Sequence, residues 1–336
     1  MSLPKDSERR GFSKMKVLVT GGSGFIGTNL VGYYLSKGAE VVNLDIAPPK
    51  NLEHKSFWKK VDILDSEGLR AAIVNFSPSH IINLAAHTGT TDRGKTLEHY
   101  AANFRGVRNL MEITRDMHSL ERIIFTSSML VCRNGYQPES ETDYCPDTLY
   151  GQSKMLGETI IRQGGELPFS WAIVRPTGIW GPWFGVPYNT LFKVIQRGLY
   201  IHPTGTNIYQ SLGFVGNTVH QLDKLMQAPS HKIHGKTFYL ADCPPINMRA
   251  WTDLVQKAFG ARRIHGMPIW TLKVVAAIGD AMKLVGWDVP PLSNSRLKNM
   301  LASFVFDLDP IITENLPYEL EEAVQITVNW MCENKS

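Results

Sequence analysis

The chain has 336 residues, of which 43% are hydrophobic, and a formal net charge of +4 at pH 7. This length allows a large core in one long or two closely joined domains. Because the charge is nearly balanced and no block of basic residues occurs, the sequence does not predict a nucleic-acid-binding surface. Four widely spaced cysteines, at positions 132, 145, 243 and 332, exclude a disulfide framework and a Cys-x-x-Cys metal site. We therefore expect a reducing, cytoplasmic setting and no metal.

A glycine-rich turn stands near the beginning of the chain, after a polar stretch (residues 1–14) that we expect to be a flexible lead-in. An apolar strand predicted over residues 17–19 is followed by Gly21, Gly24 and Gly27 and then by a helical pattern. Gly21 allows a tight turn, Gly24 lets backbone approach a pyrophosphate, and Gly27 lets the helix lie close on the strand. The order predicts a dinucleotide site, although a glycine turn alone can be purely structural.

A second apolar strand, over residues 40–44, ends in Asp45, 18 positions after Gly27. An acidic side chain there accepts hydrogen bonds from the adenosine ribose hydroxyls. It also repels a ribose 2′-phosphate, so we expect NAD rather than NADP. The alternative is a turn residue at the end of a strand.

Further strands and helices alternate along the next hundred residues. Strands are predicted over residues 57–62, 79–84 and 122–125, and helices over 66–75 and 96–117. Asp62 and Ile63 are candidates to contact adenine, and the small residues Ala85 and Ala86 allow backbone to pass close to a cofactor. The rhythm predicts an α/β fold with a Rossmann-type, doubly wound parallel sheet and a site at the carboxyl ends of its strands.

Tyr150 and Lys154 open a predicted helix that runs to about residue 163, and their spacing places them on one face. A phenol with a pKa of about 10 is a poor base at pH 7. A lysine one turn away and a positive nicotinamide ring would lower that pKa. Ser128, at the end of a neighbouring strand, can form a hydrogen bond with the substrate oxygen whose proton Tyr150 would transfer. On spacing alone, an ordinary exposed helix turn remains the alternative.

Together these motifs resemble the extended short-chain dehydrogenase/reductase family, in particular its NAD-dependent epimerase/dehydratase branch. The resemblance also covers Asn103 with Gly106, Arg175 with Pro176, and Gly181 with Pro182. It implies a catalytic triad of Ser128, Tyr150 and Lys154, with Asn103 holding the structure near it, and a homodimer built on the helices around residues 96–117 and 150–163. The implied cofactor contacts are Gly21, Gly24, Phe25, Ile26, Gly27, Asp45, Asp62, Ile63, Leu84, Ala85, Ala86, Asn103, Tyr150, Lys154 and Pro176.

Beyond Pro182 the sequence changes character, and residues 183–189 are rich in aromatics, glycine and proline. We expect an NAD-binding domain over residues 15–182 with a returning segment at about 206–235. A smaller C-terminal substrate domain is expected over residues 183–205 and 236–336. The most apolar long segment, residues 270–287, is interrupted by Lys273, Asp280 and Lys283 on roughly one face. We expect an amphipathic packed helix there rather than a membrane span.

The residues that follow Ser128 limit the types of reaction that we expect. Related sugar-nucleotide dehydratases carry an acidic residue there, whereas this chain has Met129 and Leu130. Elimination of water needs an acid near the leaving hydroxyl, so dehydration is disfavoured. Reversible oxidation of a secondary alcohol remains, either as epimerisation or with release of a product. A non-catalytic NAD-binding module is disfavoured because Tyr150 and Lys154 are both present.

The expected substrate is a nucleoside-diphosphate sugar, with contacts from His87, Ser128, Asn189, Gln210 and Arg296. Gln210 opposes this expectation, since nucleotide-sugar epimerases usually carry an arginine for the diphosphate at that position. Arg296, Arg197 and Lys193 are candidate replacements, although each can equally be a solvated surface charge. The alternative is an NAD-dependent ketoreductase or alcohol dehydrogenase of an apolar, hydroxysteroid- or flavonol-like, or sugar substrate.

Overall fold

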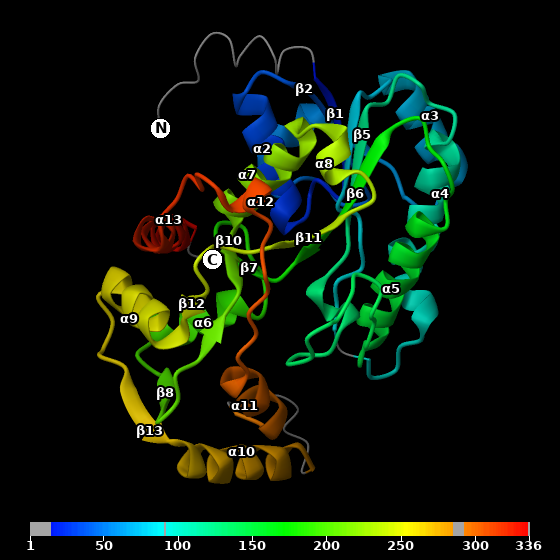
Figure 1. Ribbon diagram of the computed structural model, residues 1–336. Coiled ribbons are helices and arrows are strands. Elements are labelled where there is room, and N and C mark those ends of the chain that lie inside the picture. Colours follow the sequence, from blue (N-terminus) through cyan, green and yellow to red (C-terminus); the bar gives the residue numbers. More distant parts are fainter. Residues whose placement is uncertain (1–14, 91, 285–291, 335–336) are drawn as a thin grey trace.

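A parallel sheet of seven strands forms the centre of the larger part of the molecule (Figure 1). The computed structural model describes residues 15–90, 92–284 and 292–334, so the predicted lead-in lies outside the described residues. The strand order is β11-β6-β5-β4-β1-β2-β3, and every neighbouring pair runs parallel. These strands are β1 (Lys16–Thr20), β2 (Glu40–Asp45), β3 (Trp58–Lys60), β4 (His80–Asn83), β5 (Arg122–Thr126), β6 (Ser170–Pro176) and β11 (Thr237–Leu240).

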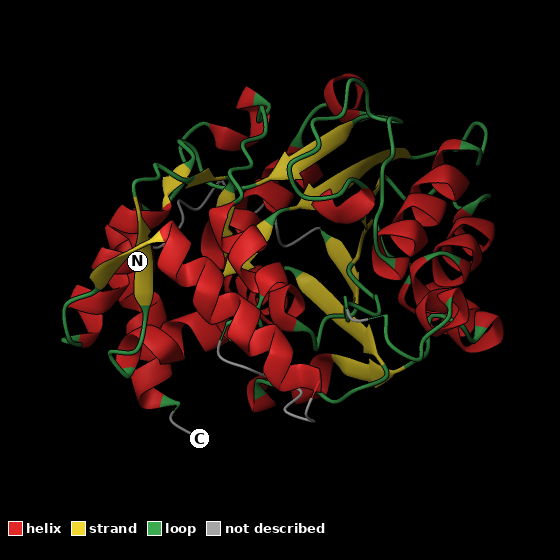
Figure 2. Cartoon of the chain, turned by 90° about the horizontal axis from the view of Figure 1, so that it is seen from below, coloured by secondary structure: helices red, strands yellow, loops and turns green. Residues whose placement is uncertain are grey.

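Helices cover both faces of this sheet, as Figure 2 shows from below. One face carries α2 (Phe25–Ser36), α7 (Val215–Gln227), α8 (Ser230–Ile233) and α12 (Pro310–Thr313). The other carries α3 (Ser66–Phe76), α4 (Arg105–Thr114) and α5 (Leu149–Arg162). Each face has its own apolar core, because the strands point alternate side chains to opposite sides. The predicted α/β, doubly wound architecture is confirmed, and its topological reversal lies between β1 and β4.

The helix expected over residues 96–117 consists of two pieces. A 3₁₀ helix, η2 (Leu97–Asn103), is followed by α4, and the backbone leaves helical geometry at Phe104, where φ is −130°. The break follows Asn103, whose side chain is committed to the backbone of a distant residue, His87. The continuous helix predicted from periodicity is therefore wrong at this point.

The returning segment reaches further than the predicted boundary at residue 235. Strand β11 pairs with β6 from Thr237 to Leu240, so these residues belong to the main sheet and not to the substrate domain. The pairing continues the alternation of buried side chains, with Phe238 and Leu240 in the core beneath α7.

The remaining elements form a smaller C-terminal part around a cluster of aromatic rings. Trp180, Phe192, Phe214 and Trp251 pack with centroid distances of 5.3–5.9 Å. Its strand pairs are β7 (Gly178–Trp180) with β10 (Leu212–Phe214), β8 (Ile201–Thr204) with β13 (His265–Pro268), and β9 (Tyr209–Gln210) with β12 (Ile246–Asn247). Its helices are α6 (Tyr188–Gln196), α9 (Met248–Phe259), α10 (Ile269–Leu284), α11 (Asn294–Leu301) and α13 (Leu320–Glu333). Within the described ranges, no helix has the length and apolarity needed to cross a membrane.

Candidate active site

The glycine turn between β1 and α2 leaves no room for side chains. Gly21 has φ of +72°, and a Cβ atom built on it would lie 2.6 Å from the backbone nitrogen of Ala85. A Cβ on Gly27 would lie 2.4 Å from the carbonyl oxygen of Gly21. Gly24 is the N-cap of α2 and supplies no side chain to cap the first N–H groups. The helix start therefore fits the pyrophosphate of a dinucleotide.

Asp45, at the end of β2, is fixed beside this turn. Its Oδ2 accepts from the backbone N–H of Ser23 at 3.0 Å, and its Oδ1 accepts from the N–H of Ala47 at 2.9 Å. Each carboxylate oxygen keeps a further lone pair for a ribose hydroxyl. The geometry fits the predicted role of Asp45, which stays a prediction.

The residues expected to hold the adenine and nicotinamide ends follow other strands. Asp62 accepts from the N–H of Leu64 at 2.9 Å, and Ile63 is buried against Gly106. Leu84, Ala85 and Ala86 directly follow β4, and the N–H of Leu84 donates to Thr20 at 3.0 Å. Phe25 and Ile26 open α2, and Pro176 ends β6. All these positions lie at strand ends or at the start of α2, as a dinucleotide site requires.

Ser128, Tyr150 and Lys154 come together at the end of β5. All three are buried, with exposed fractions of 7%, 8% and 5%. Ser128 is the N-cap of a short 3₁₀ helix, η3 (Met129–Val131), and its hydroxyl also hydrogen-bonds the Tyr150 phenol. Gly151 lets α5 approach η3, since a Cβ there would lie 2.1 Å from the Leu130 carbonyl oxygen. The sequence analysis did not predict this role of Gly151, although a glycine beside Tyr150 is a signal of a close backbone approach.

Taken together, the protein's own groups raise the pKa of Tyr150 above its usual value of 10. Burial raises that pKa, and the hydrogen bond with Ser128 offsets part of the rise. Lys154 donates to the carbonyl oxygen of Thr126 at 2.8 Å. Burial lowers the pKa of Lys154 to about 8, against the opposing effect of Glu158. At pH 7 Lys154 therefore still carries its positive charge for most of the time.

A buried ion pair lies one turn beyond Lys154, and the sequence reading missed it. Glu158 and Arg175, each 1% exposed, are joined by two hydrogen bonds of 2.9 and 2.8 Å. Tyr144 donates to the same carboxylate at 3.0 Å. The spacing of four between Lys154 and Glu158 was the available signal, whereas the partner on β6 was not visible locally. A small cavity beside this pair is lined by Asn103, Thr126, Ser127 and Lys154, among others.

Asn103 holds the loop that follows β4. Its side-chain oxygen accepts from the N–H of His87 at 2.8 Å, and its nitrogen donates to the His87 carbonyl at 3.0 Å. The same nitrogen donates to Ser153 of α5 at 2.8 Å. The His87 ring packs on Tyr100, which in turn lies 6.3 Å from the Tyr150 ring. Asn103 is thus a structural link, and Tyr100 lies between the rings of His87 and Tyr150.

The other predicted substrate residues lie in the C-terminal part. Asn189 is on α6, half-buried, with its amide 3.4 Å from the Phe184 carbonyl oxygen. Gln210 is buried and donates to the carbonyl of Ala302 at 2.8 Å, so its side chain holds the segment after α11. Arg296 is exposed on α11, and Lys193 and Arg197 are exposed at the end of α6. Their roles toward substrate stay predictions.

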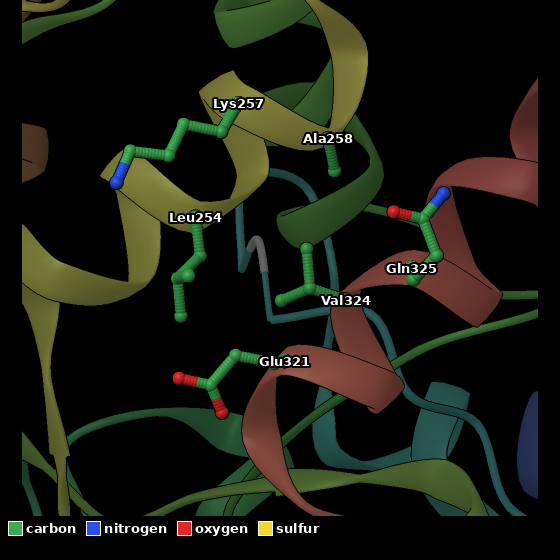
Figure 3. A pocket seen from close by; sticks show the side chains of 6 residues that line it. All are labelled: Leu254, Lys257, Ala258, Glu321, Val324 and Gln325. Carbon is green, nitrogen blue, oxygen red and sulfur yellow. The ribbon is translucent and has the colours of Figure 1, made fainter.

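Two further features lie outside this constellation. Among the residues described, no group of three or more His, Cys, Asp and Glu side chains is arranged to hold a metal ion. A hollow of about 260 Å³ lies between α9 and α13, and Figure 3 shows Leu254, Lys257 and Ala258 on one side with Glu321, Val324 and Gln325 on the other. None of the predicted site residues lines it.

Comparisons with known proteins identify the family of the chain. Residues 17–241 match the NAD dependent epimerase/dehydratase family. The chain is 27% identical over 261 residues to a 3-beta-hydroxysteroid dehydrogenase of Mycolicibacterium neoaurum, covering 74% of this chain and 71% of the relative. It is 26% identical to the N-acetyl-alpha-D-glucosaminyl-diphospho-ditrans,octacis-undecaprenol 4-epimerase of Escherichia coli O157:H7, covering 94% of both. The solved UDP-glucose 4-epimerase of Thermotoga maritima with UDP-glucose has the same fold, with a TM-score of 0.72, 18% identity, and coverage of 95% of this chain and 99% of that one.

Proposed function

Because the chain belongs to the NAD-dependent epimerase/dehydratase family, we propose that it is an NAD-dependent epimerase of a nucleoside-diphosphate sugar. The observation that carries the proposal is the buried group of Ser128, Tyr150 and Lys154, followed directly by the buried, apolar Met129. This group provides a proton acceptor for a secondary alcohol and no acid for the removal of a hydroxyl.

The residues divide the work as follows. The phenol oxygen of Tyr150 accepts the proton of the substrate hydroxyl and later returns it. Ser128 donates to the same substrate oxygen and keeps it in line with the phenol. Bound NAD would supply the acceptor and then the donor of the hydride, and its positive ring would oppose the rise that burial causes in the Tyr150 pKa. Lys154 adds its charge while it is protonated.

A second candidate is net oxidation or reduction of an apolar alcohol. Two observations favour it: the amide of Gln210 is engaged by Ala302, and the relative from Mycolicibacterium neoaurum is a 3-beta-hydroxysteroid dehydrogenase. The relative from Escherichia coli, which covers 94% of this chain and acts on a sugar joined through a diphosphate, favours epimerisation. We keep epimerisation as the first candidate.

The proposal also covers the domain division, the oligomeric state and the cellular compartment. We propose an NAD-binding part over residues 15–182 that regains residues 206–240, and a substrate-binding part formed by the rest. We also propose a homodimer on the outer surfaces of α4 and α5, which lie side by side on the sheet (Figure 1). Light scattering on the purified protein tests the dimer. Four free cysteines fit a cytoplasmic setting.

A thermal-shift screen distinguishes the two candidate functions. Nucleoside diphosphates, their sugar conjugates and apolar ketones are each added to the protein with NAD. A ligand present at 100 times its dissociation constant adds about 2.7 kcal/mol of stability. Stabilisation by one nucleoside diphosphate, and product formation without accumulation of NADH, are the expected results.

The Tyr150→Phe variant is the matched control, because it should bind the same ligands without turnover. A response confined to apolar ketones, with NADH consumed in proportion to product, would replace the first candidate with the second.

A further inference from the structure

Helix α10 packs on the rest of the molecule through one narrow seam. Leu272 and Ala276 are 4% and 0% exposed and pack against Leu297 and Leu301 of α11. Figure 1 shows α10 at the outer edge of the C-terminal part, with α11 between it and the rest of the molecule. The opposite side of α10 therefore faces outward.

That outward side is apolar. Trp270, Val274 and Ile278 are 70%, 53% and 55% exposed. They follow one another at intervals of four, and at about 100° per residue they lie opposite the seam formed by Leu272 and Ala276. Ala277 and Ala281, which are also exposed, lie on the same side. We call this set the outer face of α10.

The sequence predicts an amphipathic packed helix here, with Lys273, Asp280 and Lys283 on roughly one face, and the described part of α10 does pack on one side. Lys273 and Asp280 lie at the flank between the seam and the outer face, because the seam runs through positions 272 and 276. Residues 285–287 of the predicted segment lie outside the described residues. A helix that is apolar on opposite sides is usually enclosed on both.

Cations outnumber anions on α10 and α11 in the described part of the chain. Lys273 is exposed at its flank, and Arg296 and Lys298 are exposed on α11. In the described part of α10 and α11, Asp280 is the one acidic residue, and it accepts from the backbone and side-chain amide of Asn294 at 3.1 and 2.9 Å. The pair of helices that carries the outer face thus has a net positive charge, with Lys273 at the flank of that face.

We propose that the outer face of α10 docks on an anionic phospholipid membrane, with the helix in the plane of the surface. Apolar side chains with a tryptophan on one side and cations at the flank suit the boundary between headgroups and acyl chains. With sixteen residues the helix is shorter than the about 20 that a span requires. A symmetric contact between two copies through this face would bring two regions of like net charge together, whereas anionic lipid neutralises that charge.

The docking helix is connected to the catalytic side of the molecule. Asn134, in the loop that follows Ser128, lies 3.5 Å from Asn299 of α11. Gln137 of the same loop donates to the Val305 carbonyl at 3.0 Å. Docking through α10 therefore brings the loop beside the catalytic serine toward the membrane surface.

Vesicle flotation tests the proposal on the full chain without any need for activity. The wild type should float with vesicles of phosphatidylcholine and phosphatidylglycerol, and less with phosphatidylcholine alone. A Trp270→Ser, Ile278→Asp double variant should lose at least about tenfold in partition, or about 1.4 kcal/mol. A Lys273→Glu, Lys298→Glu variant should lose binding to the anionic vesicles only, and salt should weaken the wild type in the same way.

Val74→Asp is the matched control, because Val74 is 57% exposed on α3, far from α10 in Figure 1. This variant should float like the wild type, and circular dichroism should show all variants folded. Failure of the wild type to bind anionic vesicles would overturn the proposal. So would a dimer that Ile278→Asp converts to a monomer without any vesicle binding, since the face would then be a contact between copies.

Discussion

Helix α5 buries two charged side chains, Lys154 and Glu158, whereas helix α10 exposes four large apolar ones, Trp270, Val274, Val275 and Ile278. In α5 every buried charge has a partner within the protein: Thr126 for the lysine and Arg175 for the carboxylate. In α10 the apolar side chains have no such cover in the described part of the chain. The protein itself thus supplies partners for the buried charges of α5. The exposed apolar side chains of α10 are instead suited to contact with something outside the described chain.

Removal of the Tyr150 phenol from α5 should have the largest effect on activity. Tyr150→Phe should lower kcat by about 10²–10⁴-fold, because it deletes the proton acceptor and almost no volume. Steady-state assays with the substrate identified by the thermal-shift screen measure the loss, and titration calorimetry should show nearly unchanged NAD affinity.

Ser128→Ala provides the contrast, with a loss of about tenfold to a hundredfold for one orienting hydrogen bond. Retention of most activity in Tyr150→Phe would contradict the assignment of the proton acceptor.

The next largest effect concerns the buried ion pair behind Lys154. Glu158→Ala leaves the Arg175 guanidinium buried without its carboxylate and should cost about 3–5 kcal/mol of unfolding free energy. Urea denaturation followed by circular dichroism measures this cost. A Glu158→Leu, Arg175→Met double variant should recover much of it, because neither charge of the pair is then left buried without the other. Equal losses in the single and double variants would show that packing, not charge, decides stability here.

A smaller effect concerns the choice of cofactor. Asp45→Ala should narrow the preference for NAD over NADP by about tenfold, or 1.4 kcal/mol, because the carboxylate that repels a 2′-phosphate is lost. Calorimetric titration of both cofactors into both proteins measures the change. Asp65→Ala is the control, since Asp65 caps α3 instead. A wild type that binds NADP as well as NAD would contradict the role given to Asp45.

The smallest expected effect is a pH dependence of stability. The folded protein gives up the Lys154 proton at a pKa of about 8, below its usual value of 10.5. Between these values the unfolded chain binds more protons, so stability should rise with pH, by about 1 kcal/mol from pH 8 to 9. Denaturant midpoints without added cofactor should show the rise in the wild type and not in Lys154→Met. An equal slope in both proteins would assign it to other groups.

The sequence motifs predicted the parts of the site that depend on short spacings. The glycine turn, Asp45 and the helix face shared by Tyr150 and Lys154 each depend on the backbone geometry of one strand, turn or helix. The Glu158–Arg175 pair could not be predicted in this way, because α5 and β6 meet only when the sheet forms. The same holds for Gln210 and its partner Ala302, which are 92 positions apart.

The outer face of α10 shows a different limit. Periodicity shows which residues share a side of a helix, and in residues 270–287 apolar residues occur on more than one side. Which side packs depends on α11, whose Leu297 and Leu301 define the seam. Pairing of β11 with β6 was missed similarly, because strand order is a property of the assembled sheet.

Asn103 gives the backbone of His87 the two hydrogen bonds that a neighbouring strand would otherwise provide. Amide hydrogen exchange should detect this substitution. The His87 side chain is exposed, yet its N–H exchanges with solvent only when the Asn103 oxygen releases it. The same side chain donates to Ser153 of α5, so Asn103 holds the loop after β4 and α5 together. The exchange rate of one loop amide thus reports how often this loop separates from Asn103.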